Sequence, residues 1–311
     1  MLFLVVRGSI LRQIRWVLSF NVLIAVAVTW SHGDLFAYKV TLTTIPFTLI
    51  GLPLAIFLGF RNNSAYDRYW EARKLWGEHL LRARNLARQC LTHIDGEPID
   101  FARHGLADVR VRMVYRAISF CHALKHQLRE SPDSGGEIQA TLLPEEWTRL
   151  QAANVPGQPR RNLSQDLLMN QGLDLQHCRQ TGRIDSVLAA AIDATLSGFS
   201  AATAGCERIK SSPLPFSYTL LLHRTAYLYC FLLPFGLVDS IGLMTPFVVA
   251  IVAYTFFGLD ALGDEIEEPF GLLPNDLPLD AICRTIEIDL RQAVGDTEVP
   301  APLLPVDYYL M

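Results

Sequence analysis

The chain has 311 residues, of which 50% are hydrophobic and only 19% are charged. Soluble domains carry about 25% charged residues, so this composition indicates a membrane protein. The formal net charge of −4 excludes a strongly basic nucleic-acid-binding protein, and the high apolar content excludes a disordered chain.

The first uncharged stretch covers residues 16–33. As a helix it rises ~27 Å, which nearly crosses a hydrocarbon layer of ~30 Å. Trp16 and Trp30 lie near its two ends, where indole rings prefer the membrane interface. A cleaved signal peptide has a shorter apolar region followed by small residues, so we predict a first membrane span.

Three further stretches have the length and composition of membrane spans. The stretch at 214–238 is interrupted by His223 and Arg224, and the stretches at 41–60 and 240–259 carry no charge. Because short connections separate the spans within each pair, we expect one membrane hairpin in residues 1–60 and a second in residues 214–262. The three further stretches are 41–60, 214–238 and 240–259.

Lysine and arginine lie almost entirely on one side of these spans. On the other side we find only Lys39. Positive residues next to membrane spans stay in the cytoplasm, so both termini and the segment between the hairpins are expected there. The residues that set this orientation are Arg7, Arg12, Arg15, Arg61, Arg68, Arg73, Lys74, Arg208 and Lys210.

Residues 61–213 form a polar insert between the hairpins, with 37 of the chain's 58 charged residues (27 basic and 31 acidic). Apolar residues recur there at steps of three and four, as at Val111, Val114 and Ile118, which is typical of helices with one apolar face. We therefore predict an all-α protein with four transmembrane helices and a helical cytoplasmic domain. Loops are expected at 95–98, 131–137 and 155–162, where proline and glycine cluster.

The C-terminal end is acidic. From Asp260 onward the chain has twelve acidic residues against Arg284 and Arg291, a net charge of −10. We expect residues 263–311 to form an acidic cytoplasmic segment.

The six cysteines include no CxxC pair, which favours reduced, buried apolar fillers over a disulfide framework.

The second span carries a row of large apolar side chains. Leu52, Ile56 and Phe60 recur every four residues and therefore stack along one face of the helix. Such a row in a ring of copies would form a hydrophobic constriction, which closes a pore by dewetting. Lipid contact or ordinary core packing is the alternative interpretation of the same pattern.

A stripe of small residues runs beside this row. Gly51, Ala55 and Gly59 each precede a member of the row by one residue, about 100° round the helix. Small residues let a neighbouring helix approach closely, so the stripe is a candidate contact with the next copy in a ring.

The segment that follows, GFRNNSAYDRYWEARKLWG at 59–77, resembles the signature of the bacterial bestrophin homologues. AGCERIK at 204–210 and EPFG at 268–271 agree with the same family in order. The resemblance covers nearly the whole chain. It implies a homopentameric ion channel of a bacterial inner membrane, with Leu52, Ile56 and Phe60 at the three neck positions.

The resemblance also implies a second restriction at the cytoplasmic exit, formed in the inserted domain. We place it in residues 162–173, with Leu167 and Asn170 as the expected ring residues.

One departure from the family concerns calcium. Animal bestrophins carry a run of acidic residues after the Pro-Phe-Gly sequence, which helps to clasp calcium. Here Gly271 is followed by Leu272, Leu273, Pro274 and Asn275, and Asp276 is the only carboxylate in the run. Calcium needs six to eight oxygen ligands, so calcium activation through this clasp is not expected.

The permeant ion is expected to be a small monovalent cation, sodium especially. Bacterial members that resemble this chain are associated with such cations, and the acidic end, repeated five times, favours cations electrostatically. An anion (chloride) channel of the same architecture is the first alternative. A secondary transporter is the second, although it predicts inverted repeats and broken helices, and a non-conducting membrane scaffold is the third.

Other polar residues have weaker claims to a role. Arg224 lies within the third span, where a charge is a functional candidate by default; packing against protein neighbours is the alternative. His122 and His126 lie one helical turn apart, a spacing that can bind a metal, but no third ligand is evident in the sequence nearby. We find no enzyme motif, and we predict no catalytic residue, cofactor or metal. The expected partners are other copies of the chain, the lipid bilayer and permeant ions.

Overall fold

The computed structural model describes residues 10–32, 34–35, 38–39, 42–133, 136–153, 161–306 and 310. The chain divides into two compact units, the first made of residues 1–70, 212–269 and 273–276, and the second of residues 71–211, 270–272 and 277–311. Within the described residues nearly all regular structure is helical, which confirms the all-α prediction. The exception is an antiparallel pair of two-residue strands, β1 (Asp34–Leu35) and β2 (Tyr38–Lys39).

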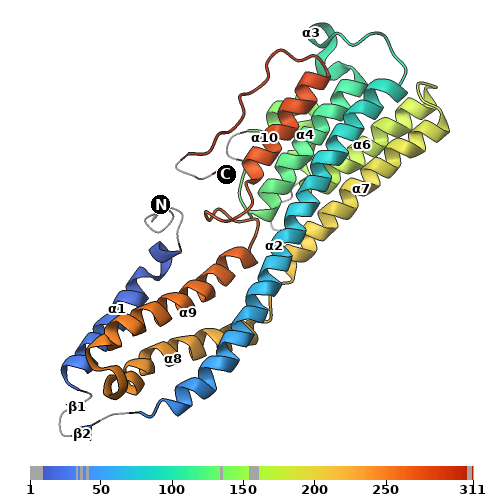
Figure 1. The fold of residues 1–311 in the computed structure, drawn as a ribbon. Coiled ribbons are helices and arrows are strands. Elements are labelled where there is room, and N and C mark those ends of the chain that lie inside the picture. The colour runs from blue at the N-terminus through green and yellow to red at the C-terminus, as the bar shows by residue number, and fades with distance from the viewer. Residues whose placement is uncertain are drawn as a thin grey trace. The chain divides into compact units, whose positions relative to one another are not determined.

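The first unit contains the apolar helices α1 (Leu11–Trp30), α8 (Phe216–Ile241) and α9 (Thr245–Glu267), with residues 45–70 of α2 (Ile45–His93). A short 3₁₀ turn, η4 (Gly242–Met244), joins α8 to α9. Helix α1 packs chiefly on α9 and then on α8, although α9 is more than 200 residues away in the chain (Figure 1). The two N-terminal apolar helices are therefore consecutive in sequence without being each other's main packing partner.

Small and apolar side chains fill the contacts of this unit. Ala25 of α1 meets Leu233 of α8 and Val249 of α9 in one buried cluster. Asn21 is the buried amide of α1; its Nδ2 donates to the carbonyl oxygen of Cys230 at 2.9 Å, whereas its Oδ1 has no hydrogen-bond partner among the described residues. An amide that leaves water without a partner costs several kcal/mol in an apolar setting, so this bond fixes the register of α1 against α8.

Helix α2 does not stop where its apolar stretch stops. The sequence boundary at residue 61 predicts a change of domain, but the helix continues to His93 without interruption. Pro53 lies inside it, and the ring removes one backbone donor there without ending the helix. Residues 71–93 belong to the second unit.

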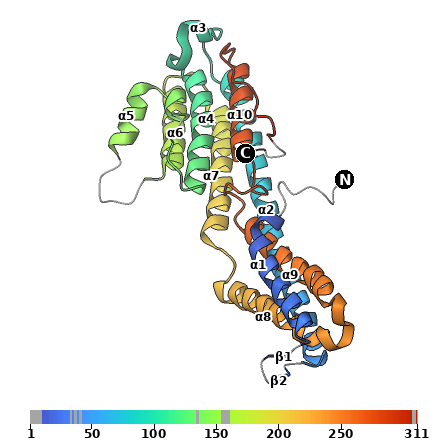
Figure 2. The same cartoon turned by 90° about the vertical axis from the view of Figure 1, so that its left-hand side faces the viewer.

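The second unit is a bundle around α4 (Val109–Leu128), which is buried along most of its length. Helix α6 (Leu163–Gln180) lies on one side of α4 and α10 (Leu279–Ala293) on another, and α7 (Ser186–Ser211) packs on α6 (Figure 2). Helix α10, which lies in the acidic C-terminal segment, is thus part of this bundle, whereas residues 263–269 and 273–276 of that segment belong to the first unit. The shorter helices are α3 (Phe101–His104), η2 (Gly105–Ala107), η3 (Gln139–Thr141) and α5 (Pro144–Ala152).

Four helical stretches are long and apolar enough to cross a membrane: α1, α2, α7 and the continuous stretch Phe216–Glu267, which holds α8 and α9. Only α7 falls outside the predicted spans. Its apolar window is 39% buried, against 22% in each of the other three stretches. Because α7 packs on α6 and α4, its apolar face is used inside the bundle.

All six cysteines are free and buried, which agrees with their interpretation as reduced, apolar fillers. Cys121 of α4 and Cys283 of α10 meet where these helices pack, and the Cys283 thiol lies 3.5 Å from the Cys121 carbonyl oxygen. Burial raises the pKa of Cys283 to about 12.

The core of the second unit holds one histidine without polar partners. His79 is fully buried, with ring centroids 5.6 Å from Phe120 and 5.9 Å from Phe199. Neither of its ring nitrogens finds a hydrogen-bond partner among the described residues. Burial lowers the pKa of His79 from about 6.5 to about 3.

This histidine makes the bundle sensitive to acid. Its pKa is lower in the folded chain than in the unfolded chain, so the neutral form stabilises the fold above about pH 6.5 and this contribution is lost as the pH falls toward 3. When the pH is lowered from about 7 to about 5, we expect the melting temperature of His79→Leu to fall less than that of the wild type. His177→Leu, at an exposed position of α6, is the control. Equal pH slopes for His79→Leu and the wild type would contradict the prediction.

Candidate functional site

The predicted row of large side chains lies on the open face of α2. Leu52, Ile56 and Phe60 are 66%, 48% and 59% exposed within the single chain. The opposite face is packed, since Leu54 and Leu58 are buried there, and Leu54 contacts Leu222 and Ala226 of α8. The chain therefore holds the row outward, away from its own core.

The same face changes character directly below the row. Asn63, Ser64 and Asp67 follow Phe60 at helical spacing, and all three side chains are exposed. The open face of α2 thus passes from large apolar groups to amide, hydroxyl and carboxylate groups within two turns.

The small-residue stripe is divided between two surroundings. Gly51 faces its own chain, where a Cβ atom would lie 3.0 Å from the hydroxyl oxygen of Tyr229 on α8. Ala55 and Gly59 are exposed, and a Cβ atom at Gly59 would meet no described atom within 4 Å. Only the lower part of the stripe is therefore open to another copy.

A buried ion pair lies one residue below the row. Arg61 is fully buried, and its Nη1 donates to Asp260 Oδ1 at 3.0 Å and to the Asp260 carbonyl oxygen at 3.2 Å. Its Nη2 donates to Asp264 and lies 3.6 Å from Glu267 Oε2. His223 Nδ1 completes the group at 2.6 Å from Asp260 Oδ2.

Our sequence reasoning missed this pair, although a signal for it was present. Arg61 immediately follows the apolar stretch of α2, and Asp260 immediately follows the apolar stretch of α9. Both stretches were assigned the same cytoplasmic end, so opposite charges at these two positions meet at one level. The close packing also uses Gly263, where a Cβ atom would overlap Asn62 Oδ1.

Arg224 takes no part in this group. Its side chain is exposed, whereas its neighbour His223 turns toward Asp260. Of the two polar residues that interrupt the third span, the histidine is therefore the one bound into the chain's own ion-pair network.

The two predicted exit residues differ in their surroundings. Leu167 is buried in the bundle of the second unit within the single chain. Asn170 is half-buried, and its Nδ2 donates to Glu146 Oε1 at 2.7 Å. The residue pattern of α6 left its rotation open; the outward apolar side chains on this helix are Met169 and Leu173, 66% and 55% exposed.

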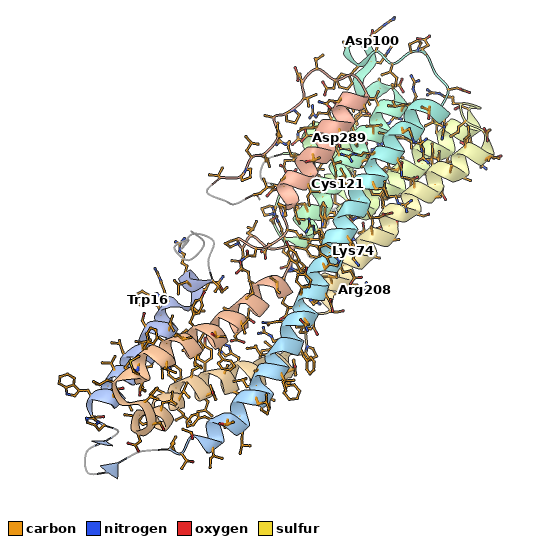
Figure 3. The ribbon with its side chains drawn as sticks, in the orientation of Figure 1. Trp16, Lys74, Asp100, Cys121, Arg208 and Asp289 are labelled. Carbon is orange, nitrogen blue, oxygen red and sulfur yellow. The ribbon has the colours of Figure 1, made fainter. Side chains whose placement is uncertain are left out.

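The acidic end is partly neutralised, because cations from outside it pair with several of its carboxylates. Asp289, on α10, accepts hydrogen bonds from Arg84 Nε and Nη2 at 2.8 and 2.6 Å (Figure 3). Asp280 lies 2.8 Å from Lys125 Nζ and 2.6 Å from Arg129 Nη1. Further pairs join Asp260, Asp264 and Glu267 to Arg61, and Glu287 and Asp296 to Arg291.

The turn after α9 is held by hydrogen bonds. Glu265 Oε1 accepts from both the backbone nitrogen and the side-chain amide of Asn275 at 3.1 Å. Asp276 Oδ2 accepts from the backbone nitrogen of Leu273 at 2.7 Å. These carboxylates are thus already bound by N–H donors from the turn itself.

Comparison with known proteins gives consistent matches along the chain. A family model described as "Bacterial/Fungal Bestrophin protein" matches residues 1–292. The voltage-dependent anion channel-forming protein YneE of Escherichia coli K12 is 42% identical, over 97% of this chain and 93% of its own length. The voltage-dependent anion channel-forming protein mll4386 of Mesorhizobium japonicum is 41% identical, over 99% and 93%.

Solved structures agree with this assignment. A bacterial bestrophin homologue from Klebsiella pneumoniae superposes with a TM-score of 0.79 at 38% sequence identity, covering 91% of this chain and 98% of that one. The whole-chain family match, the identity to its relatives and the shared fold together show that this chain belongs to the bestrophin family.

Proposed function

We propose that this chain forms a membrane ion channel by self-association, and that the channel passively conducts small monovalent anions such as chloride. The observation that carries the proposal is the outward row of Leu52, Ile56 and Phe60 in a chain whose relatives are named anion channel-forming proteins. The proposed function involves no covalent chemistry.

The row serves as the neck of the pore. Large apolar side chains around a narrow axis exclude water, so ions pass only when the ring is wide enough to hydrate. The exposed polar residues below Phe60 support this orientation, because a wetted vestibule beneath a dry neck calls for such groups, whereas a lipid-facing surface does not.

Five copies surround the axis in the proposed assembly. Each contributes α1, the first part of α2, α8 and α9 as membrane spans, and Ala55 and Gly59 are open for contact with a neighbouring copy. The distribution of lysine and arginine supports cytoplasmic termini in a bacterial inner membrane. The burial of α7 supports its place in the helical bundle outside the membrane.

A cytoplasmic restriction, where α6 forms one, uses the exposed side chains Met169 and Leu173. We propose these two residues in place of Leu167, which is buried in the single chain, and Asn170, which donates a hydrogen bond to Glu146.

Conduction of cations, sodium especially, is the second candidate function, and the net charge of the C-terminal end favours it. The contacts of that end reduce the force of the argument. Carboxylates paired with arginine or lysine at 2.6–3.0 Å contribute little long-range field. The anion proposal, which the names of the relatives support, is therefore preferred.

Reversal potentials in a planar bilayer distinguish the two ions. With purified protein and a tenfold gradient of KCl, we expect the zero-current potential to have the sign of an anion conductor, and to approach about 59 mV in magnitude for ideal selectivity. The opposite sign would establish cation conduction. Replacing chloride with gluconate on both sides is the control, because it should abolish most of an anion current.

Truncation at the neck tests the pore-lining assignment. We expect Ile56→Ala to raise ion flux into vesicles, because a smaller side chain widens and wets the ring. Ile251→Ala is the matched control, since Ile251 is a similarly exposed isoleucine on α9. Native mass spectrometry of the same preparations should give five copies per particle. Unchanged flux in Ile56→Ala, or a monomeric particle, would contradict the assignment.

Removal of the buried cation tests what holds the neck helix in place. Arg61→Met leaves Asp260 buried without its partner, which costs about 3–5 kcal/mol of stability, so we expect a much lower melting temperature in detergent. Adding Asp260→Asn should recover part of the loss. Arg224→Gln, at an exposed position, should change the melting temperature little. Equal effects of Arg61→Met and Arg224→Gln would contradict the prediction.

A further inference from the structure

Two histidines of α4 and the segment after it bring metal-binding atoms together. His126 Nε2 lies 3.2 Å from Glu137 Oε2 and 3.7 Å from Asp133 Oδ1. The three ligand atoms all lie within 4.8 Å of one another, and each residue is partly buried. The further ligands that the sequence did not reveal are Asp133 and Glu137, seven and eleven residues after His126.

These separations suit a small divalent ion. Zinc binds histidine nitrogen and carboxylate oxygen at about 2.0–2.2 Å in tetrahedral geometry, so its ligand atoms lie about 3.3–3.5 Å from each other. The two distances from His126 Nε2, 3.2 and 3.7 Å, bracket that value. The two carboxylate oxygens lie within 4.8 Å of each other, so they would close on an ion that binds.

The ligands are already oriented by other groups. His126 Nδ1 lies 3.0 Å from Ser131 Oγ, a bond that directs the lone pair of Nε2 toward the carboxylates when Nδ1 is the donor. The Asp133 carboxylate accepts hydrogen bonds from the backbone nitrogens of Glu137 at 3.0 Å and Ile138 at 3.1 Å. A carboxylate held by backbone donors and a hydrogen-bonding partner on the second histidine nitrogen are outer supports that metal sites use.

A further buried nitrogen points at the same carboxylate. His122 is 2% exposed, and its Nδ1 lies 3.2 Å from Glu137 Oε2 without the geometry of a hydrogen bond. It is one turn before His126 on α4. It is therefore placed to hold Glu137 or to join the ligand set.

The local charges leave room for a cation. Lys125 Nζ lies 2.6 Å from Glu137 Oε2 and 2.8 Å from Asp280 Oδ1, and Arg129 pairs with Asp280, whereas the ion-pair partner of Asp133 is His126. Arg129 and Lys125 both pair with Asp280, so Lys125 keeps a partner when Glu137 turns to a metal. A cavity of about 650 Å³ bordered by His126 and Asp133 provides an entry path.

We propose that His126 Nε2, Asp133 Oδ1 and Glu137 Oε2 form a binding site for a divalent transition metal of the zinc class, with His122 beside it. An ion there ties the segment after α4 to that helix. All four residues belong to the second unit, so the site is distinct from the apolar row of α2, which lies in the first unit.

Zinc binding to the full-length protein in detergent tests the site. After chelator treatment, titration with zinc chloride should give one ion per chain. His126→Gln and Asp133→Asn should each weaken binding at least about tenfold, whereas His177→Gln, at an exposed histidine of α6, should not. X-ray absorption should show nitrogen and oxygen neighbours at about 2.0–2.2 Å and no sulfur at about 2.3 Å.

The metal-free melting temperature and elution volume of each variant show whether it is folded. Where Asp133→Asn disturbs the fold, Glu137→Gln is the substitute, because it removes a ligand while keeping the side-chain volume. Absence of saturable binding to the wild type, sulfur in the absorption spectrum, or full affinity in both His126→Gln and the carboxylate variant would overturn the proposal. A Lys125-centred ion-pair network alone would produce the first of these results.

Discussion

The contact between Arg61 and Asp260 is the constraint on which the first unit depends. A guanidinium with no exposed surface lies against a nearly buried carboxylate at 3.0 Å, and each would be costly to bury alone. The pair sets the height of α2 against α9 at the residue where both apolar stretches end. Because Phe60 directly precedes Arg61, that height also determines where the apolar row of α2 stops and the exposed polar residues begin.

Such a pair contributes less stability than an apolar contact could, but it specifies the register of α2 against α9. Buried ion pairs are often no more stable than well-packed hydrophobic groups of the same volume. A leucine at either position would pack as well one turn higher or lower, since apolar helices slide past each other at small cost. Arg61 instead finds Asp260, Asp264 and Glu267 at one register only. His223 adds a second element, α8, to the same definition.

Composition and periodicity predicted much of this structure. Helices α1 and α8 begin and end within five residues of the expected spans, because uncharged stretches of this length have few alternatives to a helix, whereas α9 begins five residues later than expected and ends eight residues later, at Glu267. The loop at 95–98 and the described residues of the loop at 131–137 were predicted for the equally local reason that glycine and proline cluster there, and most of the third predicted loop, 155–162, lies outside the described residues. That Leu52, Ile56 and Phe60 share one face of α2 also followed from their spacing, whereas the orientation of that face away from the chain's own core did not.

Features that depend on contacts between distant segments could not be predicted in this way. The stripe on α6 is compatible with several rotations of the helix, and only packing against α4 decides that Leu167 points inward. The pairing of α1 with α9 joins the two ends of the chain. The charge of the acidic end was counted correctly, but the cations that pair with it from outside come from α2 and from α4 and its C-terminal end, so this pairing appears only in three dimensions.

The burial of every cysteine has a practical consequence for chemistry performed on the intact molecule. Thiolate is the species that reacts with alkylating and methanethiosulfonate reagents, and cysteines in apolar surroundings form little of it. All six native thiols are shielded in this way. The native cysteines should therefore react little with such reagents. The rate at which a single cysteine introduced along α2 is modified, with reagent added on either side of the bilayer, would then measure the exposure of that position to water.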